Sequence, residues 1–204
     1  SQGNIWICAG DALNLYVPPD KEKEKPARFE KFRLQGSTAS ITWAYEESSE
    51  ELLLFSEYLY SFNQKERKII NTGIRLENSL VTSVVRDSHG DLLMGTVLHG
   101  VLKLEYDEAN KSYRRVDPGK INVAPGKRTR LLMDHNKHLW IGTEGGLYRY
   151  VPNTGNIEHF QPDDLRNATI SDNTIYSLYE DNTGVLWIGT FSKGLNKHDF
   201  YRKP

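Results

Sequence analysis

The stretch Val185-Leu-Trp-Ile-Gly-Thr190 decides the fold, because the chain contains it more than once. Leu139-Trp-Ile-Gly-Thr143 is a second copy, and Leu92-Leu-Met-Gly-Thr96 is a third copy with two substitutions. The glycines of the three copies are 47 residues apart each time. A fixed period of this length indicates a repeat architecture.

Two flanking elements recur with the same period to within one residue. A turn that begins with an aspartate precedes each copy, and these aspartates are Asp87, Asp134 and Asp181. A glycine with a short apolar run follows each copy, beginning at Gly100, Gly146 and Gly194. Three separate elements that share one period are very unlikely to arise by chance.

Two weaker copies lie upstream. Asn4-Ile-Trp-Ile-Cys8 places a cysteine where the later copies have glycine, and Glu51-Leu-Leu-Leu-Phe55 places a phenylalanine there. The interval from Phe55 to Gly95 is shorter than the others, which we attribute to a trimmed turn around Glu57 and Tyr58. The sequence therefore predicts five repeats.

The pattern within one repeat predicts four short strands. Thr174–Tyr179 alternates and is rich in aromatic and branched residues, as in a strand. A turn at Asp181–Gly184 leads to the apolar strand Val185–Thr190, and a third strand begins at Gly194. In the preceding repeat Asn156–Phe160 supplies a fourth strand. Four antiparallel strands in about 47 residues are typical of a propeller blade, whereas a helical repeat would show a 3.6-residue stripe.

This unit can be laid along the whole chain. It predicts an all-β protein in which residues 1–204 form one β-propeller domain. Five blades are expected, at about residues 4–35, 38–75, 79–117, 127–161 and 172–204. The first blade lacks its first strand and the fifth lacks its fourth. We therefore expect a segment of a larger propeller, or a piece completed by a second copy, with open strand edges that favour association.

Composition excludes several classes of partner. The formal net charge is −1, which gives no general reason to expect nucleic acid. No apolar run approaches the roughly 20 residues of a membrane helix. His135 and His138 have the spacing of two metal ligands, but no third ligand lies nearby in the sequence. We expect no metal and no cofactor.

The repeat residues themselves have a structural interpretation. The recurring aspartates are expected to cap turns rather than to form a ring of carboxylates. Trp6, Trp140 and Trp187 lie in strands that are apolar on both faces, so we expect them to pack between blades rather than to stack on sugars. The glycine two residues after each tryptophan position is expected to leave room for a neighbouring element.

At Asp181–Asp199 the resemblance to a known family becomes specific. The pattern Asp-x-x-Gly-x-Leu-Trp-Ile-Gly-Thr followed by Gly-Leu resembles the two-component regulator propeller repeat. That repeat forms the extracytoplasmic sensor of hybrid two-component regulators in Bacteroidetes. The resemblance implies a periplasmic domain that recognises glycan-derived oligosaccharides and signals to a histidine kinase. Kinase activity would lie elsewhere in such a protein, so we expect no enzyme activity in this segment.

Ligand contacts are expected on the propeller face that carries the loops between second and third strands and the loops between blades. Loops of this kind carry binding residues on a rigid scaffold. The candidate ligand-binding residues are Tyr58, His99, Lys127, Arg128, Arg130, Glu144, Phe191 and Lys193, and no catalytic residue is predicted.

One of these regions is strongly basic. Residues 111–130 contain seven basic residues and the single acid Asp117. Arginine binds carboxylate or sulfate with two parallel hydrogen bonds, which would suit a uronic or sulfated sugar. A solvated strand and loop is the alternative explanation.

Three function classes stay open on sequence grounds. The leading one is a sensor that binds an oligosaccharide without catalysis. The second is a propeller lyase or hydrolase, because the streptogramin-lyase propellers carry a related Asp-x-x-Gly-x-x-Trp turn. The third is a platform that docks another protein domain, the remaining blades of the parent sensor or a second copy.

Overall fold

The computed structural model describes residues 4–20, 24–77, 79–123, 128–163 and 169–199. Within these ranges the chain forms eighteen β-strands and one short 3₁₀ helix, Gly119–Ile121. The residues group into two compact units, 1–81 and 82–204, which are described separately.

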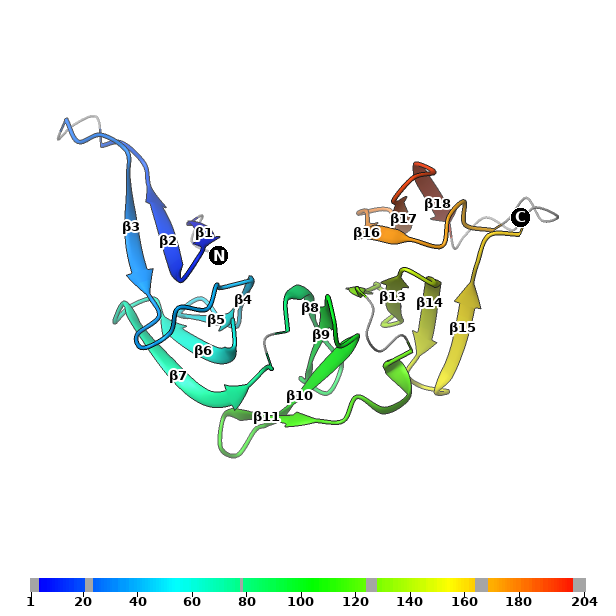
Figure 1. The fold of residues 1–204 in the computed structure, drawn as a ribbon, viewed down its shortest axis with the longest axis horizontal. Helices are drawn as coiled ribbons and strands as arrows, with labels where there is room; N and C mark the ends of the chain where they lie inside the picture. Colours follow the sequence, from blue (N-terminus) through cyan, green and yellow to red (C-terminus); the bar gives the residue numbers. More distant parts are fainter. Residues whose placement is uncertain (1–3, 21–23, 78, 124–127, 164–168, 200–204) are drawn as a thin grey trace. The chain divides into compact units, whose positions relative to one another are not determined.

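The first unit contains two antiparallel sheets in which each strand pairs with its neighbours in sequence (Figure 1). The first sheet has three strands: β1 (Ile5–Ala9), β2 (Ala12–Val17) and β3 (Arg28–Arg33). The second has four strands: β4 (Trp43–Glu46), β5 (Glu51–Phe55), β6 (Tyr58–Asn63) and β7 (Lys68–Arg75).

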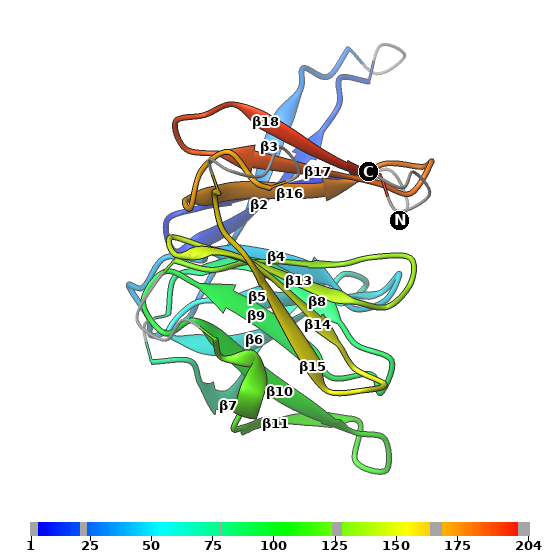
Figure 2. The same cartoon turned by 90° about the vertical axis from the view of Figure 1, so that its right-hand side faces the viewer.

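The second unit contains three sheets of the same kind. One is formed by β8 (Val81–Arg86), β9 (Leu92–Thr96), β10 (Val101–Asp107) and β11 (Ser112–Val116). The next is formed by β12 (Arg130–Met133), β13 (Leu139–Thr143), β14 (Gly146–Val151) and β15 (Asn156–Phe160). The last has β16 (Ile175–Glu180), β17 (Val185–Thr190) and β18 (Leu195–Asp199), which lie side by side in Figure 2.

These sheets confirm the predicted fold class, an all-β protein built from four-stranded antiparallel propeller blades. Among the described residues the first and last sheets have three strands each, as expected. The grouping into a single domain with the stated blade boundaries stays a prediction. The sequence pattern at Ile41–Tyr45 predicts the first strand of the second blade, but the register with β5 begins at Trp43, and the N–H of Ile41 donates to the carbonyl of Gly10.

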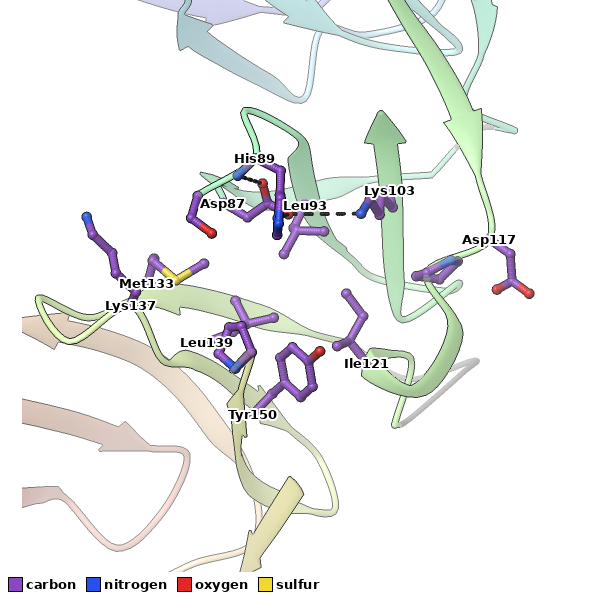
Figure 3. Close-up of a pocket in the computed structure, with 13 residues that line it drawn as sticks. Asp87, His89, Leu93, Lys103, Asp117, Ile121, Met133, Lys137, Leu139 and Tyr150 are labelled. Atoms are coloured by element: carbon purple, nitrogen blue, oxygen red, sulfur yellow. Dashed lines mark hydrogen bonds and ion pairs between the residues drawn. The ribbon is translucent and has the colours of Figure 1, made fainter. Parts of the chain in front are cut away.

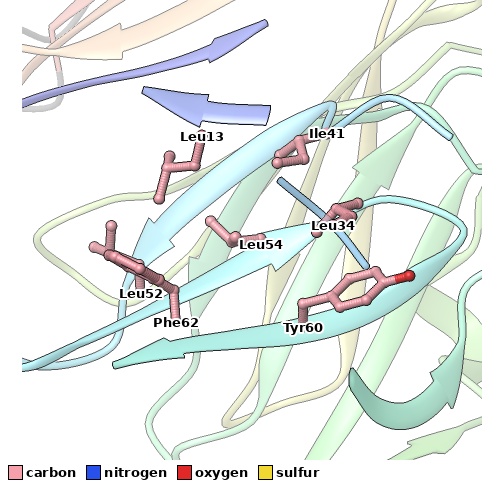
Figure 4. Close-up of a cluster of buried hydrophobic side chains, with 7 residues drawn as sticks. All are labelled: Leu13, Leu34, Ile41, Leu52, Leu54, Tyr60 and Phe62. Atoms are coloured by element: carbon pink, nitrogen blue, oxygen red, sulfur yellow. The ribbon is translucent and has the colours of Figure 1, made fainter. Parts of the chain in front are cut away.

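The first unit is held by a cluster of buried side chains between its two sheets (Figure 4). Leu13 comes from β2, and Leu52, Leu54 and Phe62 come from β5 and β6. Trp6 packs against this cluster, with its ring centroid 5.3 Å from that of Phe62. The tryptophan of the first repeat thus contributes to packing, as predicted.

The second unit has two clusters that repeat one another. Leu93, Leu139 and Ile141 belong to the cluster between the second unit's first two sheets. Trp140, Leu186 and Ile188 occupy the corresponding positions 47 residues later and belong to the next cluster. Position 93 therefore faces the β12–β15 sheet in the way that Trp140, only 1% exposed, faces the β16–β18 sheet.

The repeated aspartate caps its turn, as predicted, and also does something more. In Asp134 one carboxylate oxygen accepts the backbone N–H of His138 at 2.8 Å. The other accepts the indole N–H of Trp140 at 2.9 Å. Asp181 and Trp187 make the same pair at 2.8 Å. The aspartate thus fixes both the turn and the tryptophan of its own repeat.

The glycine of the motif is required by close approach between sheets. A Cβ added to Gly142 would lie 2.6 Å from Cγ2 of Ile175, on the first strand of the next sheet. At Gly95 it would lie 2.6 Å from the carbonyl oxygen of Thr129, just before β12. The space that the sequence predicted beside these glycines is therefore occupied by the following blade.

The threonine that ends the motif anchors the loop between second and third strands. Its hydroxyl donates to a glycine carbonyl across the loop, from Thr96 to Gly100, from Thr143 to Gly146 and from Thr190 to Gly194, at 2.8–3.0 Å. The loops between these anchors differ in sequence from blade to blade.

Candidate functional site

The candidate site is built around Arg130, the first residue of β12. Its Nε donates to the carbonyl oxygen of Tyr176 in β16 at 3.2 Å, so the guanidinium bridges two neighbouring sheets. Its Nη1 is buried and has no acceptor among the described residues. An unpaired buried donor is costly, which makes this nitrogen available to a ligand oxygen.

Tyr176, whose carbonyl oxygen accepts the Arg130 bond, also carries one of two neighbouring aromatic rings. The ring centroids of Tyr176 and Phe191 are 5.9 Å apart with an interplanar angle of 32°. The two residues are 48% and 70% exposed. The two exposed rings lie together beside the strand to which the Arg130 guanidinium is bonded. We call Arg128, Arg130, Tyr176 and Phe191 the arginine–aromatic cluster.

The cluster is electropositive. Burial, and then the charge of Arg128, lower the pKa of Arg130, while the Tyr176 side chain acts in the opposite direction. Arg128 is half-buried just before β12. Two guanidinium groups that repel one another are stabilised when an anion binds between them, because it offsets their mutual repulsion.

The loop that carries Phe191 is held by side chains of the segment before β16. Asp172 accepts hydrogen bonds from the backbone N–H and the hydroxyl of Ser192, at 3.1 and 2.7 Å. The Phe191 N–H donates to the carbonyl of Thr174 at 2.9 Å. The aromatic ring is therefore presented from a braced loop, which lowers the entropy that binding would cost.

Of the eight predicted site residues, Arg128, Arg130 and Phe191 belong to this cluster, in which Phe191 is linked to Arg130 through Tyr176. Lys193 is exposed on the same loop as Phe191. Glu144 is exposed in the loop between β13 and β14. Among the described residues, neither side chain forms a hydrogen bond or ion pair with the cluster.

The other predicted residues lie elsewhere. His99 is half-buried in the loop between β9 and β10, with its Nε2 buried and unpartnered among the described residues. Tyr58 is half-buried in the first unit, against the core at Leu54 and Phe62. Lys127 lies outside the described residues.

Sequence reasoning missed Tyr176 and Asp172. Tyr176 was interpreted only as part of an alternating strand, although its position places it on the face opposite Ile175, which is buried. Alternation could have identified it as an outward-facing aromatic residue. Asp172 carried no signal, because its role depends on how close the loop at Ser192 comes in space.

The described residues offer the cluster no metal site. No group of three or more His, Cys, Asp or Glu side chains that could hold a metal ion is found within the described ranges. What the cluster can do is hold an anionic group on its guanidiniums and stack a flat or apolar ring face on its aromatic rings.

The comparisons with known proteins agree with the motif. Residues 169–192 match the family model described as two component regulator propeller. A protein named histidine kinase P4 from Formosa agariphila is 41% identical over 142 residues, which are 68% of this chain and 10% of that protein. The chain thus spans about a tenth of the curated relative that it matches.

Solved structures show the same fold at low sequence identity. The extracellular domains of two hybrid two component systems from B. thetaiotaomicron are 16% and 18% identical, with TM-scores of 0.67 and 0.69. They cover 95% and 97% of this chain, which spans only 25% and 26% of theirs. Virginiamycin B lyase from Staphylococcus aureus is 13% identical with a TM-score of 0.65, over 99% of this chain and 68% of that one.

Among the described residues no helix is long and apolar enough to cross a membrane. The β-propeller fold, the repeated motif and the matched segment lead to one conclusion. This chain carries the two component regulator propeller repeat, at residues 169–192, as its sequence motif indicates.

Proposed function

We propose that this chain is a ligand-sensing propeller segment of the extracytoplasmic part of a two-component sensor. Its ligand is an acidic oligosaccharide derived from a glycan, and it performs no catalysis. The proposal is supported by the two component regulator propeller repeat, by the relative named a histidine kinase and by the extracellular domains of similar fold. The periplasm is the compartment that this role requires.

The observation that carries the proposal is the arginine–aromatic cluster. Phe191 and Tyr176 offer ring faces that can stack on the apolar face of a sugar ring. Arg130 has a buried nitrogen with no acceptor among the described residues, and Arg128 adds a second positive charge. A sugar that carries a carboxylate or a sulfate satisfies both features at once.

Binding without chemistry fits the side chains of this cluster. A guanidinium keeps its proton at neutral pH, and Phe191 has none to give, so of the four residues only Tyr176 carries a group that can act as a general acid or base. The similarity to virginiamycin B lyase is a similarity of fold at 13% identity and does not transfer an active site.

Calorimetric titration of the 204-residue chain with tetragalacturonate tests the proposal, with neutral maltotetraose as the comparison ligand. We expect binding of the acidic sugar only. Phe191→Ala and the double change Arg128→Ala, Arg130→Gln should each weaken it at least about tenfold, as expected for lost stacking or charge-assisted bonds. Raising the salt concentration should weaken it further, because the attraction is electrostatic.

Phe29→Ala is the matched control, because Phe29 is a 58% exposed ring in β3 of the first unit. It should leave affinity unchanged. The proposal is wrong if the arginine and Phe191 variants bind as tightly as the unmodified chain. It is also wrong if neither uronic nor sulfated oligosaccharides bind at all.

A further inference from the structure

A pocket of about 200 Å³ lies in the second unit between the β8–β11 and β12–β15 sheets (Figure 3). Its apolar walls are formed by Leu93, Ile121, Met133, Leu139 and Tyr150. Its polar end carries Asp87, His89 and Lys103, and it shares no residue with the arginine–aromatic cluster.

The pocket exists because of one substitution in the repeat. Position 93 holds leucine where the two later copies hold Trp140 and Trp187. In the next pair of sheets the indole of Trp140 fills the corresponding space, against Leu186, Ile188 and Ile170. Leu93 is much smaller than an indole, so the space between the first two sheets of this unit is only partly filled.

The same substitution leaves an acceptor without its donor. In the later repeats the second carboxylate oxygen of Asp134 or Asp181 accepts an indole N–H. In Asp87, Oδ1 caps the turn by accepting the N–H groups of His89 and Asp91, at 2.8 and 3.0 Å. Oδ2 has only Lys103 Nζ at 4.0 Å and His89 Nδ1 at 3.9 Å, both beyond hydrogen-bond distance.

A cation is also present where the ring is missing. In the later repeats the residue paired with tryptophan across the sheet is basic, and its charge lies over the ring. Arg149 is 5.6 Å from the Trp140 ring centroid, and Lys197 is 5.8 Å from that of Trp187. Lys103 pairs with Leu93 in the same register. Figure 3 shows it extending towards Asp87 over the polar end of the pocket, and it also forms a 2.7 Å ion pair with Asp91.

We propose that this pocket binds a small planar aromatic molecule that carries a ring N–H, of the indole class. The ring lies between Leu93, Leu139 and Tyr150, in the place of the missing tryptophan side chain. Its N–H donates to Oδ2 of Asp87, and Lys103 lies near its face. The site is independent of the oligosaccharide site proposed above.

The size and lining of the pocket support this occupant. An engineered apolar cavity of about 150 Å³ in another protein stays dry and binds benzene, so a pocket of this volume can hold a slightly larger ring. The carboxylate at one end then selects for a donor, since a hydrogen bond to a charged acceptor contributes more than a neutral one.

Indole itself is the probe, measured on the 204-residue chain by calorimetry and by saturation-transfer NMR. We expect saturable binding, and at least about tenfold weaker binding of 1-methylindole, which has the same shape but no N–H. N-acetyltryptophanamide tests whether the pocket accepts a tryptophan side chain of a peptide as well as a free heterocycle. The larger molecule can bind only if the pocket is open to solvent.

Leu93→Trp fills the pocket from within and supplies the N–H to Asp87. It should abolish indole binding and raise the melting temperature. Leu93→Phe fills most of the same space and should also block binding, which keeps the test valid if the tryptophan variant misfolds.

Trp140→Leu is the positive control, because it should open a second pocket of the same kind beside Asp134. The proposal is overturned if the unmodified chain does not bind indole while Trp140→Leu does. It is equally overturned if Leu93→Trp, correctly folded, binds indole as well as the unmodified chain.

Discussion

Asp134 satisfies a backbone turn with one oxygen and a buried indole with the other. Both Asp134 and Trp140 are almost fully buried, so water cannot replace the missing hydrogen-bond partner if one of the two side chains is removed. Asp87 caps the corresponding turn of the preceding repeat but faces leucine instead of tryptophan. Substituting each aspartate in turn therefore separates the free energy of the turn hydrogen bonds from that of the hydrogen bond to the indole.

Asp134→Ala should lower the free energy of unfolding by about 2 kcal/mol more than Asp87→Ala, because a buried N–H left without an acceptor costs about 1–3 kcal/mol. Urea unfolding of both variants measures this difference. Equal losses would mean that the indole bond contributes nothing beyond the turn.

His198 makes stability depend on pH. Burial, and then the charge of Arg149, lower its pKa, so the folded chain binds the proton less readily than the unfolded chain. The stabilising contribution is complete above the ordinary histidine pKa of about 6.5, and it is lost as pH falls below that value. His198→Gln should flatten the decline of melting temperature between about pH 6.5 and 5.5, and an unchanged slope would contradict this.

At this scale the sequence predicted the turn aspartates and the room beside the glycines. It did not predict that Asp134 holds Trp140, because that bond depends on how the turn folds the two residues together. Nor did it predict that the hydroxyl of Thr143 closes its loop. Both contacts depend on the local backbone conformation, which residue type alone does not predict.

The strands themselves were predictable almost residue by residue. Val185–Thr190 and Asn156–Phe160 have the predicted bounds, since turn residues delimit them on both sides. The β4 strand starts two residues late because Ile41 bonds to Gly10, a contact between sheets that local pattern does not reveal.

The contact between neighbouring elements depends on the motif glycine. Gly142→Ala should cost about 1–3 kcal/mol, the usual cost of overpacking, because its Cβ would press on Ile175. Gly189→Ala should cost much less. There the added Cβ would press on the hydroxyl of Ser177, which belongs to an exposed side chain that can rotate away. Thermal unfolding of the two variants compares them, and equal destabilisation would show that approach of the next sheet is not the cause.

At the scale of the whole chain, the face of the β16–β18 sheet that carries Trp187 exposes large apolar side chains. Tyr179 and Leu195 are 63% and 64% exposed on the face that carries Trp187. The corresponding tryptophan one repeat earlier, Trp140, is buried by the following sheet. An apolar sheet face of this kind favours association.

We therefore expect a solution mass above the 23.4 kDa of one chain when light scattering is coupled to size exclusion. Replacing both Tyr179 and Leu195 with serine should shift the mass towards the monomer. A monomeric mass for the unmodified chain at high concentration would contradict the prediction.

The candidate site was predictable only in part. Arg128, Arg130 and Phe191 were proposed from charge and loop position, and Arg130 reaches Tyr176 because their two sheets lie next to one another. Tyr176 was missed, and Tyr58 lies against the core of the first unit instead. The motif gives the order of the blades, but which loop side chains converge depends on their conformations.

The most direct test of the account is a map of backbone amide shifts in the ¹H–¹⁵N NMR spectrum of the chain, titrated with tetragalacturonate. The account predicts that shifts concentrate at Arg128–Arg130, at Thr174–Tyr176 and in the loop that carries Phe191. Titration with maltotetraose should leave the amide signals of these residues unshifted. Shifts confined to the turns at Asp87 and Asp134, or none with any acidic sugar, would contradict the proposed sensor site.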